Sequence, residues 1–198
     1  MAYDKFEVLR SSAVPMPIEN VDTDQIIPAR FLKATERKGF GDNLFRDWRY
    51  HPDNMPKADF VLNNPTYSGK ILVGGKNFGS GSSREHAAWA IYDYGFRCVV
   101  SSFFADIFKN NSMNIGLLPV QVSDSFLDKI FKAIETDPGS QFEVNLPEQS
   151  ITILASGESE SFVISGYKKH NMINGYDDID FLQSIKSDIL SFAQKQLA

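Results

Sequence analysis

The run KILVGG (70–75) is followed closely by GSGSSREHAAWAIYDYG (79–95), and the two together predict a strand, a glycine-rich loop and a helix. A short apolar run bounded by glycines is typical of a buried strand. The helix is predicted over 82–94 and ends at Gly95, because its apolar residues recur at helical spacing. These residues are Ala87, Ala90, Ile91 and Tyr94. Such a loop can direct backbone N–H groups and the positive end of the helix dipole toward a bound anion.

The first turn of this predicted helix supports two interpretations. Ser82 and Glu85 have the spacing of a capping box, in which each side chain accepts a hydrogen bond from the other residue's backbone N–H. Capping does not explain the second hydroxyl at Ser83 or the cation at Arg84, which opposes the helix dipole. A residue that breaks a local rule without local gain often contacts a ligand. These residues alone leave both interpretations open.

The sequence matches two nucleotide-binding motifs only in part. Residues 79–84 begin like G-x-G-x-x-G, but Arg84 occupies the place of the third glycine, which allows close packing of helix on strand. Gly75-Lys76 is followed by Asn77, so the phosphate-binding loop of nucleotide triphosphatases is also missing. The sequence therefore argues against a dinucleotide or nucleoside triphosphate as ligand.

Length and composition are those of an ordinary globular protein. The 198 residues, 42% hydrophobic and 23% charged, suffice for one domain, and we expect a single domain over 1–198. No apolar run approaches the roughly 20 residues of a membrane span, and no signal peptide is visible. The net charge of −5 argues against nucleic acid as the main partner. We expect a cytoplasmic protein that acts without membrane or nucleic acid.

Positive charge is concentrated between Arg30 and Arg49. The basic residues there are Arg30, Lys33, Arg37, Lys38, Arg46 and Arg49, against the acidic Glu36, Asp42 and Asp47. This excess fits either the steering of a small polycarboxylate, the docking of a partner, or simply a solvated surface.

The residues that bind metals are sparse. A lone cysteine, Cys98, excludes an intramolecular disulfide and a cluster held by several thiolates of this chain. Cys98 lies in an apolar run and is predicted to be a small buried side chain. His51, His86 and His170 are far apart in the sequence. We therefore predict no metal site within this chain.

The remaining patterns complete an α/β fold, with a mixed sheet and flanking helices. Strands are predicted at 5–14, 97–102, 117–122, on both sides of 147–149 within 141–154, and at 160–165. Helices are predicted at 103–111, 123–139 and 179–197, with Pro28 in a helical first turn and an irregular segment over 34–58. The last helix is expected to bury Phe181, Leu182, Ile185, Ile189 and Phe192.

Four ordered blocks carry a resemblance to a known family. They are NVDTDQIIPARFLK (20–33), GGKNFGSGSSREHAAWAI (74–91), YGFRCVVSSFFADIFKNNSMNIGLLPV (94–120) and NGYDDID (174–180). In these blocks the chain resembles the small subunits of bacterial 3-isopropylmalate dehydratase, which are the swivelling domain of the aconitase superfamily made as a separate chain. The resemblance covers nearly the whole length and implies a swivelling β/β/α fold.

The resemblance also implies an activity and a partner. The family's large subunit would carry a 4Fe–4S cluster, and the two subunits would form a heterodimer or a larger assembly. Together they would interconvert 2-isopropylmalate and 3-isopropylmalate, small dicarboxylates of leucine biosynthesis, by loss and return of water. A related hydro-lyase acting on citraconate, methylmalate or homoaconitate is the alternative, and a scaffolding protein without chemistry is a third reading.

By the same resemblance, individual residues receive roles. Ser82 would be the general base, acting as an alkoxide, Arg84 would bind a substrate carboxylate, and Ser83 would hydrogen-bond nearby. Asp24 matches an active-site aspartate, although an aspartate in a turn also caps it. Aconitase binds a third carboxylate through an arginine, and no residue of 31–41 is assigned as its counterpart. Phe31 and Leu32, in the family's specificity loop, are therefore candidates to contact an apolar branch of the substrate.

Overall fold

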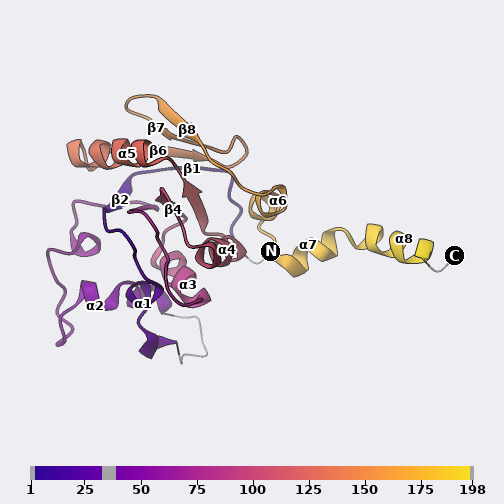
Figure 1. Cartoon of the computed structure of the whole chain (residues 1–198), viewed down its shortest axis with the longest axis horizontal. Coiled ribbons are helices and arrows are strands. Elements are labelled where there is room, and N and C mark those ends of the chain that lie inside the picture. The colour runs from indigo at the N-terminus through magenta and orange to yellow at the C-terminus, as the bar shows by residue number, and fades with distance from the viewer. Residues whose placement is uncertain (1–2, 33–38, 197–198) are drawn as a thin grey trace.

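The computed structural model describes residues 3–32 and 39–196, and its strands form two four-stranded sheets (Figure 1). The parallel sheet has the order β2 (Ala13–Met16), β3 (Ile71–Gly74), β4 (Cys98–Ser101) and β5 (Leu118–Gln121). The antiparallel sheet has the order β1 (Val8–Ser11), β6 (Phe142–Asn145), β7 (Ser150–Ile153) and β8 (Glu158–Ser161). The predicted α/β fold is confirmed, with parallel and antiparallel strands divided between the two sheets.

The predicted strand over 5–14 is divided between the sheets. β1 pairs with β6, whereas β2, which follows after the single residue Ser12, pairs with β3. Ser12 is held at this crossing because its Oγ donates to the carbonyl of Ser68 at 2.7 Å. Gly69 has φ +130°, and a Cβ there would lie 2.6 Å from the carbonyl carbon of Ser12. The prediction of one continuous strand is therefore wrong, because alternation alone does not reveal a change of sheet.

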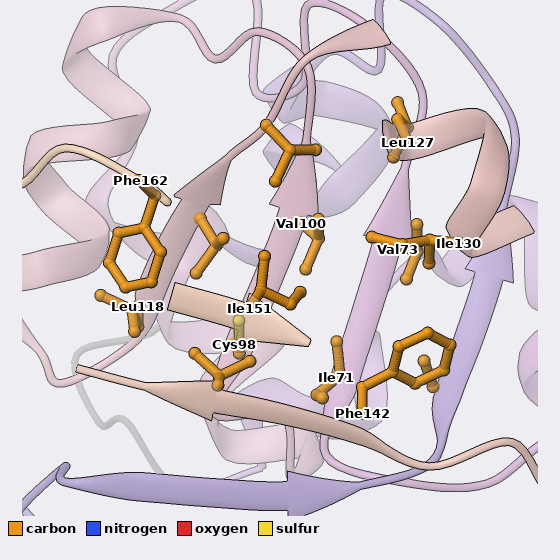
Figure 2. Packing of buried hydrophobic residues seen from close by; sticks show 14 of the residues in the cluster. Ile71, Val73, Cys98, Val100, Leu118, Leu127, Ile130, Phe142, Ile151 and Phe162 are labelled. Carbon is orange, nitrogen blue, oxygen red and sulfur yellow. The ribbon is translucent and has the colours of Figure 1, made fainter. Parts of the chain in front are cut away.

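Both faces of the parallel sheet are buried. Along β3, Ile71 and Val73 face one hydrophobic cluster and Leu72 faces another. The first cluster fills the space between the two sheets and includes Phe142 and Ile151 of the antiparallel sheet (Figure 2). Side chains of a strand alternate between its two faces, and here both faces are buried against apolar clusters. The strand therefore appears in the sequence as a continuous apolar run.

Helices complete the layers. α3 (Glu85–Tyr94) contributes its alanines and Ile91 to the second cluster, and α4 (Asp106–Asn114) contributes Phe108. α5 (Asp124–Thr136) packs Leu127 and Ile130 into the first cluster (Figure 2), and Ser123 caps its start, because the Ser123 Oγ accepts a hydrogen bond from Phe126 N. The order of layers, sheet on sheet on helices, agrees with the expected β/β/α fold.

The segment between β2 and β3 is irregular and partly helical, and within it the described residues 39–58 agree with the irregular segment predicted over 34–58. It contains α1 (Thr23–Ile26), the 3-10 turns η1 (Ala29–Phe31), η2 (Phe40–Asn43) and η3 (Val61–Asn63), and α2 (Arg46–Arg49). Pro28 stands one residue before the first helical residue of η1. Lys33, Glu36, Arg37 and Lys38 of the basic stretch lie outside the described residues.

The C-terminal prediction is wrong in three respects. The chain adds an unpredicted helix, α6 (Gly166–Asn174), and then divides the predicted helix into α7 (Asp178–Ser184) and α8 (Lys186–Gln196), which extend away from the sheets (Figure 1). Phe181 packs against Tyr167, but Leu182, Ile189 and Phe192 are 48%, 44% and 65% exposed. An apolar stripe predicts a helix without specifying which surface covers it.

Among the described residues, no helix is long and apolar enough to cross a membrane.

Candidate active site

The glycine-rich loop is held against the start of α1 by its backbone. Gly79 N and Ser80 N both donate to the carbonyl of Val21, at 2.8 and 3.0 Å, and Thr23 N donates to the carbonyl of Ser80 at 2.8 Å. The Thr23 side chain adds a further bond, from Oγ1 to the carbonyl of Ser82 at 2.8 Å, and is almost fully buried. Two segments about sixty residues apart in sequence thus form one unit.

Glycine is required in this loop because the neighbouring chain approaches closely. Gly79 and Gly81 have φ of +78° and +88°, in the region that favours glycine. A Cβ at Gly79 would lie 2.5 Å from the Cβ of Phe108, and a Cβ at Gly81 would lie 2.7 Å from Cγ of Asp22. The two glycines therefore bring the loop against α4 and against α1.

Ser82 does not cap α3, so the capping-box prediction and the helix start at 82 are wrong. The helix begins at Glu85, Arg84 occupies the N-cap position with φ −139° and ψ 108°, and no side chain of the described residues caps this end. The close pairing of the loop with α1 keeps residues 82–84 out of the helix. Gly95 ends the helix with φ +123°, as predicted. The Ser82 hydroxyl therefore has no capping role in the fold.

The capping box belongs instead to α1. Asp24 N donates to Oδ1 of Asp22 at 2.6 Å, and Asp22 N donates to Oε1 of Gln25 at 2.8 Å. Asp22 is therefore the capping aspartate, which contradicts the alternative that Asp24 caps this turn.

Asp24 instead pairs with Arg84. Both carboxylate oxygens accept from the guanidinium: Nη2 donates to Oδ2 at 2.8 Å, and Nη1 donates to Oδ1. The Arg84 side chain is 14% exposed and the Asp24 side chain 50% exposed. A guanidinium has five N–H donors, so this two-point pairing leaves others for a ligand. The fork geometry fixes the orientation of Arg84 before any ligand arrives.

These groups meet in a pocket of about 270 Å³. Ser82, Ser83 and Arg84 line it together with Thr23, and residues 105–108 at the start of α4 form a further part of its wall. Ser82 and Ser83 are exposed, and among the described residues the Ser82 Oγ has no hydrogen-bond partner. The arrangement offers an unengaged hydroxyl beside an oriented cation, which suits an anionic ligand.

The structure does not bring Phe31 and Leu32 to this pocket. Phe31 lines a second pocket, of about 630 Å³, with Arg30 and Arg46, and the Arg30 guanidinium lies 4.7 Å from its ring centroid. Leu32 packs, partly buried, against the second hydrophobic cluster. In the described part of the chain, therefore, the apolar wall beside Ser82 comes from α4, and the role of Phe31 and Leu32 stays a prediction.

Part of the basic stretch has structural contacts. Arg30 pairs with Asp47 and lowers the pKa of that carboxyl below its usual value. Arg49 is buried and donates to the carbonyl of Leu44 at 3.3 Å. Fixed contacts of this kind leave Arg30 and Arg49 less available for a ligand, and the choice among steering, docking and a solvated surface stays open.

The described residues do not fit a metal centre. They contain no group of three or more His, Cys, Asp and Glu side chains that could hold an ion. Cys98 is fully buried between the sheets (Figure 2), and burial raises the pKa of its thiol well above the usual value. The thiol therefore behaves as a small apolar side chain, as predicted.

Comparisons with known proteins identify the family. Residues 3–125 match the Aconitase C-terminal domain. The 3-isopropylmalate dehydratase small subunit of Cytophaga hutchinsonii is 62% identical over 96% of this chain and 94% of its own length, and that of Christiangramia forsetii is 61% identical over 98% and 94%. The chain belongs to the family of 3-isopropylmalate dehydratase small subunits. A solved structure of 3-isopropylmalate dehydratase from Methanocaldococcus jannaschii matches with a TM-score of 0.66 and 25% identity, covering 95% of this chain and 99% of that one.

The family match includes both halves of the pocket. Residues 3–125 contain Asp24, the loop with Ser82 and Arg84, and the start of α4. Two contributors to the pocket were not predicted, namely Thr23 and the wall at Ala105 to Phe108. The block SSFFADIF (101–108) was visible as part of the resemblance to these small subunits, but no feature of its sequence distinguishes its pocket-facing residues from its buried ones.

Proposed function

We propose that this chain is the small subunit of a hydro-lyase that interconverts 2-isopropylmalate and 3-isopropylmalate in leucine biosynthesis. It would act in the cytoplasm as one domain, paired with a large subunit in a heterodimer or larger assembly. The names of its relatives support the reaction. The observation that carries the proposal is the pocket in which Ser82 and Ser83 lie beside Arg84, already oriented by Asp24.

Ser82 is proposed to move the proton. In the elimination, its alkoxide takes a hydrogen from the carbon next to a carboxylate, the electron pair of that C–H bond becomes the C=C bond, and hydroxide leaves the neighbouring carbon. In the return step, hydroxide adds to the carbon that lost the hydrogen, and the serine gives its proton to the carbon that lost the hydroxide, which yields the isomer and restores the alkoxide. A serine oxygen is a weak anion in water, and the adjacent guanidinium and the uncapped N-terminus of α3 favour its charged form.

Arg84, Ser83 and Asp24 are proposed to position the substrate. Arg84 binds one carboxylate, on which negative charge increases as the proton leaves, and fixed donors stabilise that charge most in the transition state. Ser83 hydrogen-bonds in the same region, and Asp24 keeps the guanidinium in place through its two bonds. A 4Fe–4S cluster, expected on the large subunit, would when bound supply Lewis-acid assistance to the departing hydroxide.

The test is to reconstitute this chain with its large subunit and follow the unsaturated dicarboxylate by its ultraviolet absorbance. Ser82→Ala is expected to lower kcat by about 10²–10⁴-fold, the usual contribution of a proton-transferring group. Ser80→Ala is the matched control, because Ser80 is in the same loop but its Oγ donates to the backbone of Asn20 at 3.3 Å.

Normal turnover by the folded Ser82→Ala enzyme would overturn the role of Ser82. If the unaltered pair dehydrates methylmalate or hydrates homoaconitate but does not act on isopropylmalate, the chain is the small subunit of the related hydro-lyase. If the pair turns over none of these acids, the chain has kept the fold without the chemistry.

A further inference from the structure

The start of α4 forms one wall of the Ser82 pocket, and the glycine-rich loop lines another part of it. Phe108 fixes this wall in place: it is 2% exposed and fits against Gly79, where a Cβ would overlap its side chain. The two residues before it, Asp106 and Ile107, line the pocket. Because Phe108 fixes the backbone of the first turn, the neighbouring positions are held at a constant place relative to Ser82.

Ile107 is an apolar side chain that folding leaves about half exposed, at 53%. The buried face of α4 is formed by Phe108, Ser112 and Met113, so Ile107 lies off that face. Apolar surface gains free energy when it leaves water, in proportion to the area covered. A ligand that places an alkyl group on this wall therefore gains binding energy that a smaller or charged group does not.

Asp106 adds a charge to the same wall. Its side chain is exposed, and among the described residues its carboxylate has no ion-pair or hydrogen-bond partner. A carboxylate on the ligand next to it would be repelled, because like charges at short range disfavour each other's ionised form. The pocket thus combines a cation at Arg84 with an apolar and negatively charged wall at the start of α4.

We propose that Ile107 and Asp106 select the substrate's branch: Ile107 contacts an alkyl group, and Asp106 disfavours a third carboxylate at that position. The substrate class is 2-alkylmalates, in which two carboxylates and one apolar branch are carried on adjacent carbons. This inference rests on the proposed hydro-lyase activity and deepens it. It places the apolar contact on α4, at residues for which the sequence alone predicted no role.

The experiment uses the reconstituted two-subunit enzyme and three substrates with a growing branch: 2-methylmalate, 2-ethylmalate and 2-isopropylmalate. In Ile107→Ala, kcat/KM is expected to fall at least about tenfold for the isopropyl substrate and to change little for the methyl substrate, because a lost apolar contact penalises the larger branch. Ile179→Ala is the matched control. Ile179 also follows an aspartate in the first turn of a helix and is 61% exposed, but it lines another pocket.

Asp106→Asn tests whether Asp106 disfavours a third carboxylate. Citrate has the malate frame with a carboxymethyl branch, and it is used as a competitor. Its inhibition constant is expected to fall several-fold in Asp106→Asn and to stay constant in the Ile179→Ala control.

Three outcomes would overturn the inference. One is equal loss for all three substrates in Ile107→Ala together with weaker binding of the large subunit, which would make Ile107 a subunit contact. The second is an unchanged substrate profile, and the third is an unchanged citrate inhibition constant in Asp106→Asn. Failure of the proposed function is read separately, from the unaltered enzyme, which would then not turn over 2-isopropylmalate.

Discussion

Gly81→Ala should be more destabilising than an ordinary glycine replacement at positive φ, because it disturbs the start of α1 as well as the loop. An L-residue in the left-handed region costs about 1–2 kcal/mol. At Gly81 the new Cβ would also collide with the Asp22 carboxylate, which caps α1. Loss of a capping side chain costs about 0.5–2 kcal/mol. The free energy of unfolding should therefore fall by about 1.5–4 kcal/mol.

Gly157→Ala is the control that separates the two contributions. Gly157 has φ +73°, but a Cβ there would meet nothing within 4 Å. Only the backbone cost of about 1–2 kcal/mol should appear. Urea unfolding of both variants, followed by circular dichroism, measures the difference. Equal destabilisation of the two variants would refute the reasoning, since it would mean that Asp22 moves aside without loss.

The same pair of variants connects the fold to the site. Displacing Asp22 moves the first turn of α1, and Asp24 on that turn orients Arg84. In the reconstituted enzyme, Gly81→Ala should raise KM for the hydroxy-dicarboxylate at a temperature where the chain is still folded. Gly157→Ala should leave KM unchanged, because Gly157 is in the turn between β7 and β8.

Two further outcomes are expected. Arg84→Lys should raise KM by about tenfold or more, because an ammonium cannot reproduce the two-point binding of carboxylates. Arg97→Lys is the control, because Arg97 donates to backbone carbonyls. An unchanged KM and kcat in Arg84→Lys would refute the role of Arg84. Cys98 should react with a thiol reagent at pH 8 only as fast as the chain unfolds, because burial raises its pKa; immediate labelling of the folded protein would contradict this.

The elements with local signals were predictable from the sequence. The apolar run at 70–75, the amphipathic helix after Ser123 and the hairpin around 147–149 each carry their own pattern, and all three are present. The change of sheet at Ser12 was not predictable, because it depends on Ser68 and Gly69, far along the chain. The exposed face of α7 and α8 was missed for a similar reason: helical spacing does not reveal what covers a helix.

Of the predicted site residues, Ser82, Ser83 and Arg84 line one pocket and Asp24 pairs with Arg84, whereas Phe31 lines another pocket. The loop from Ser82 to Arg84 could be recognised because it broke the local rules of a helix start. Its partner across the pocket, the first turn of α4, could not, because Ile107 looks like any core isoleucine in the sequence. Only the close approach of Phe108 to Gly79 shows that this turn is fixed beside the serines.

At this site, structural roles and the proposed chemical roles fall on different, neighbouring residues. Asp22 caps α1 and Thr23 bonds the two segments together, so the adjacent Asp24 is not needed for folding and can hold Arg84. The loop backbone, paired with α1, keeps Ser82 outside α3, so its hydroxyl is not needed as a cap. A capping serine would have its oxygen engaged by a backbone N–H and would be a poorer base. The sequence pattern that resembles a helix cap is thus compatible with chemistry only because the helix begins after Arg84.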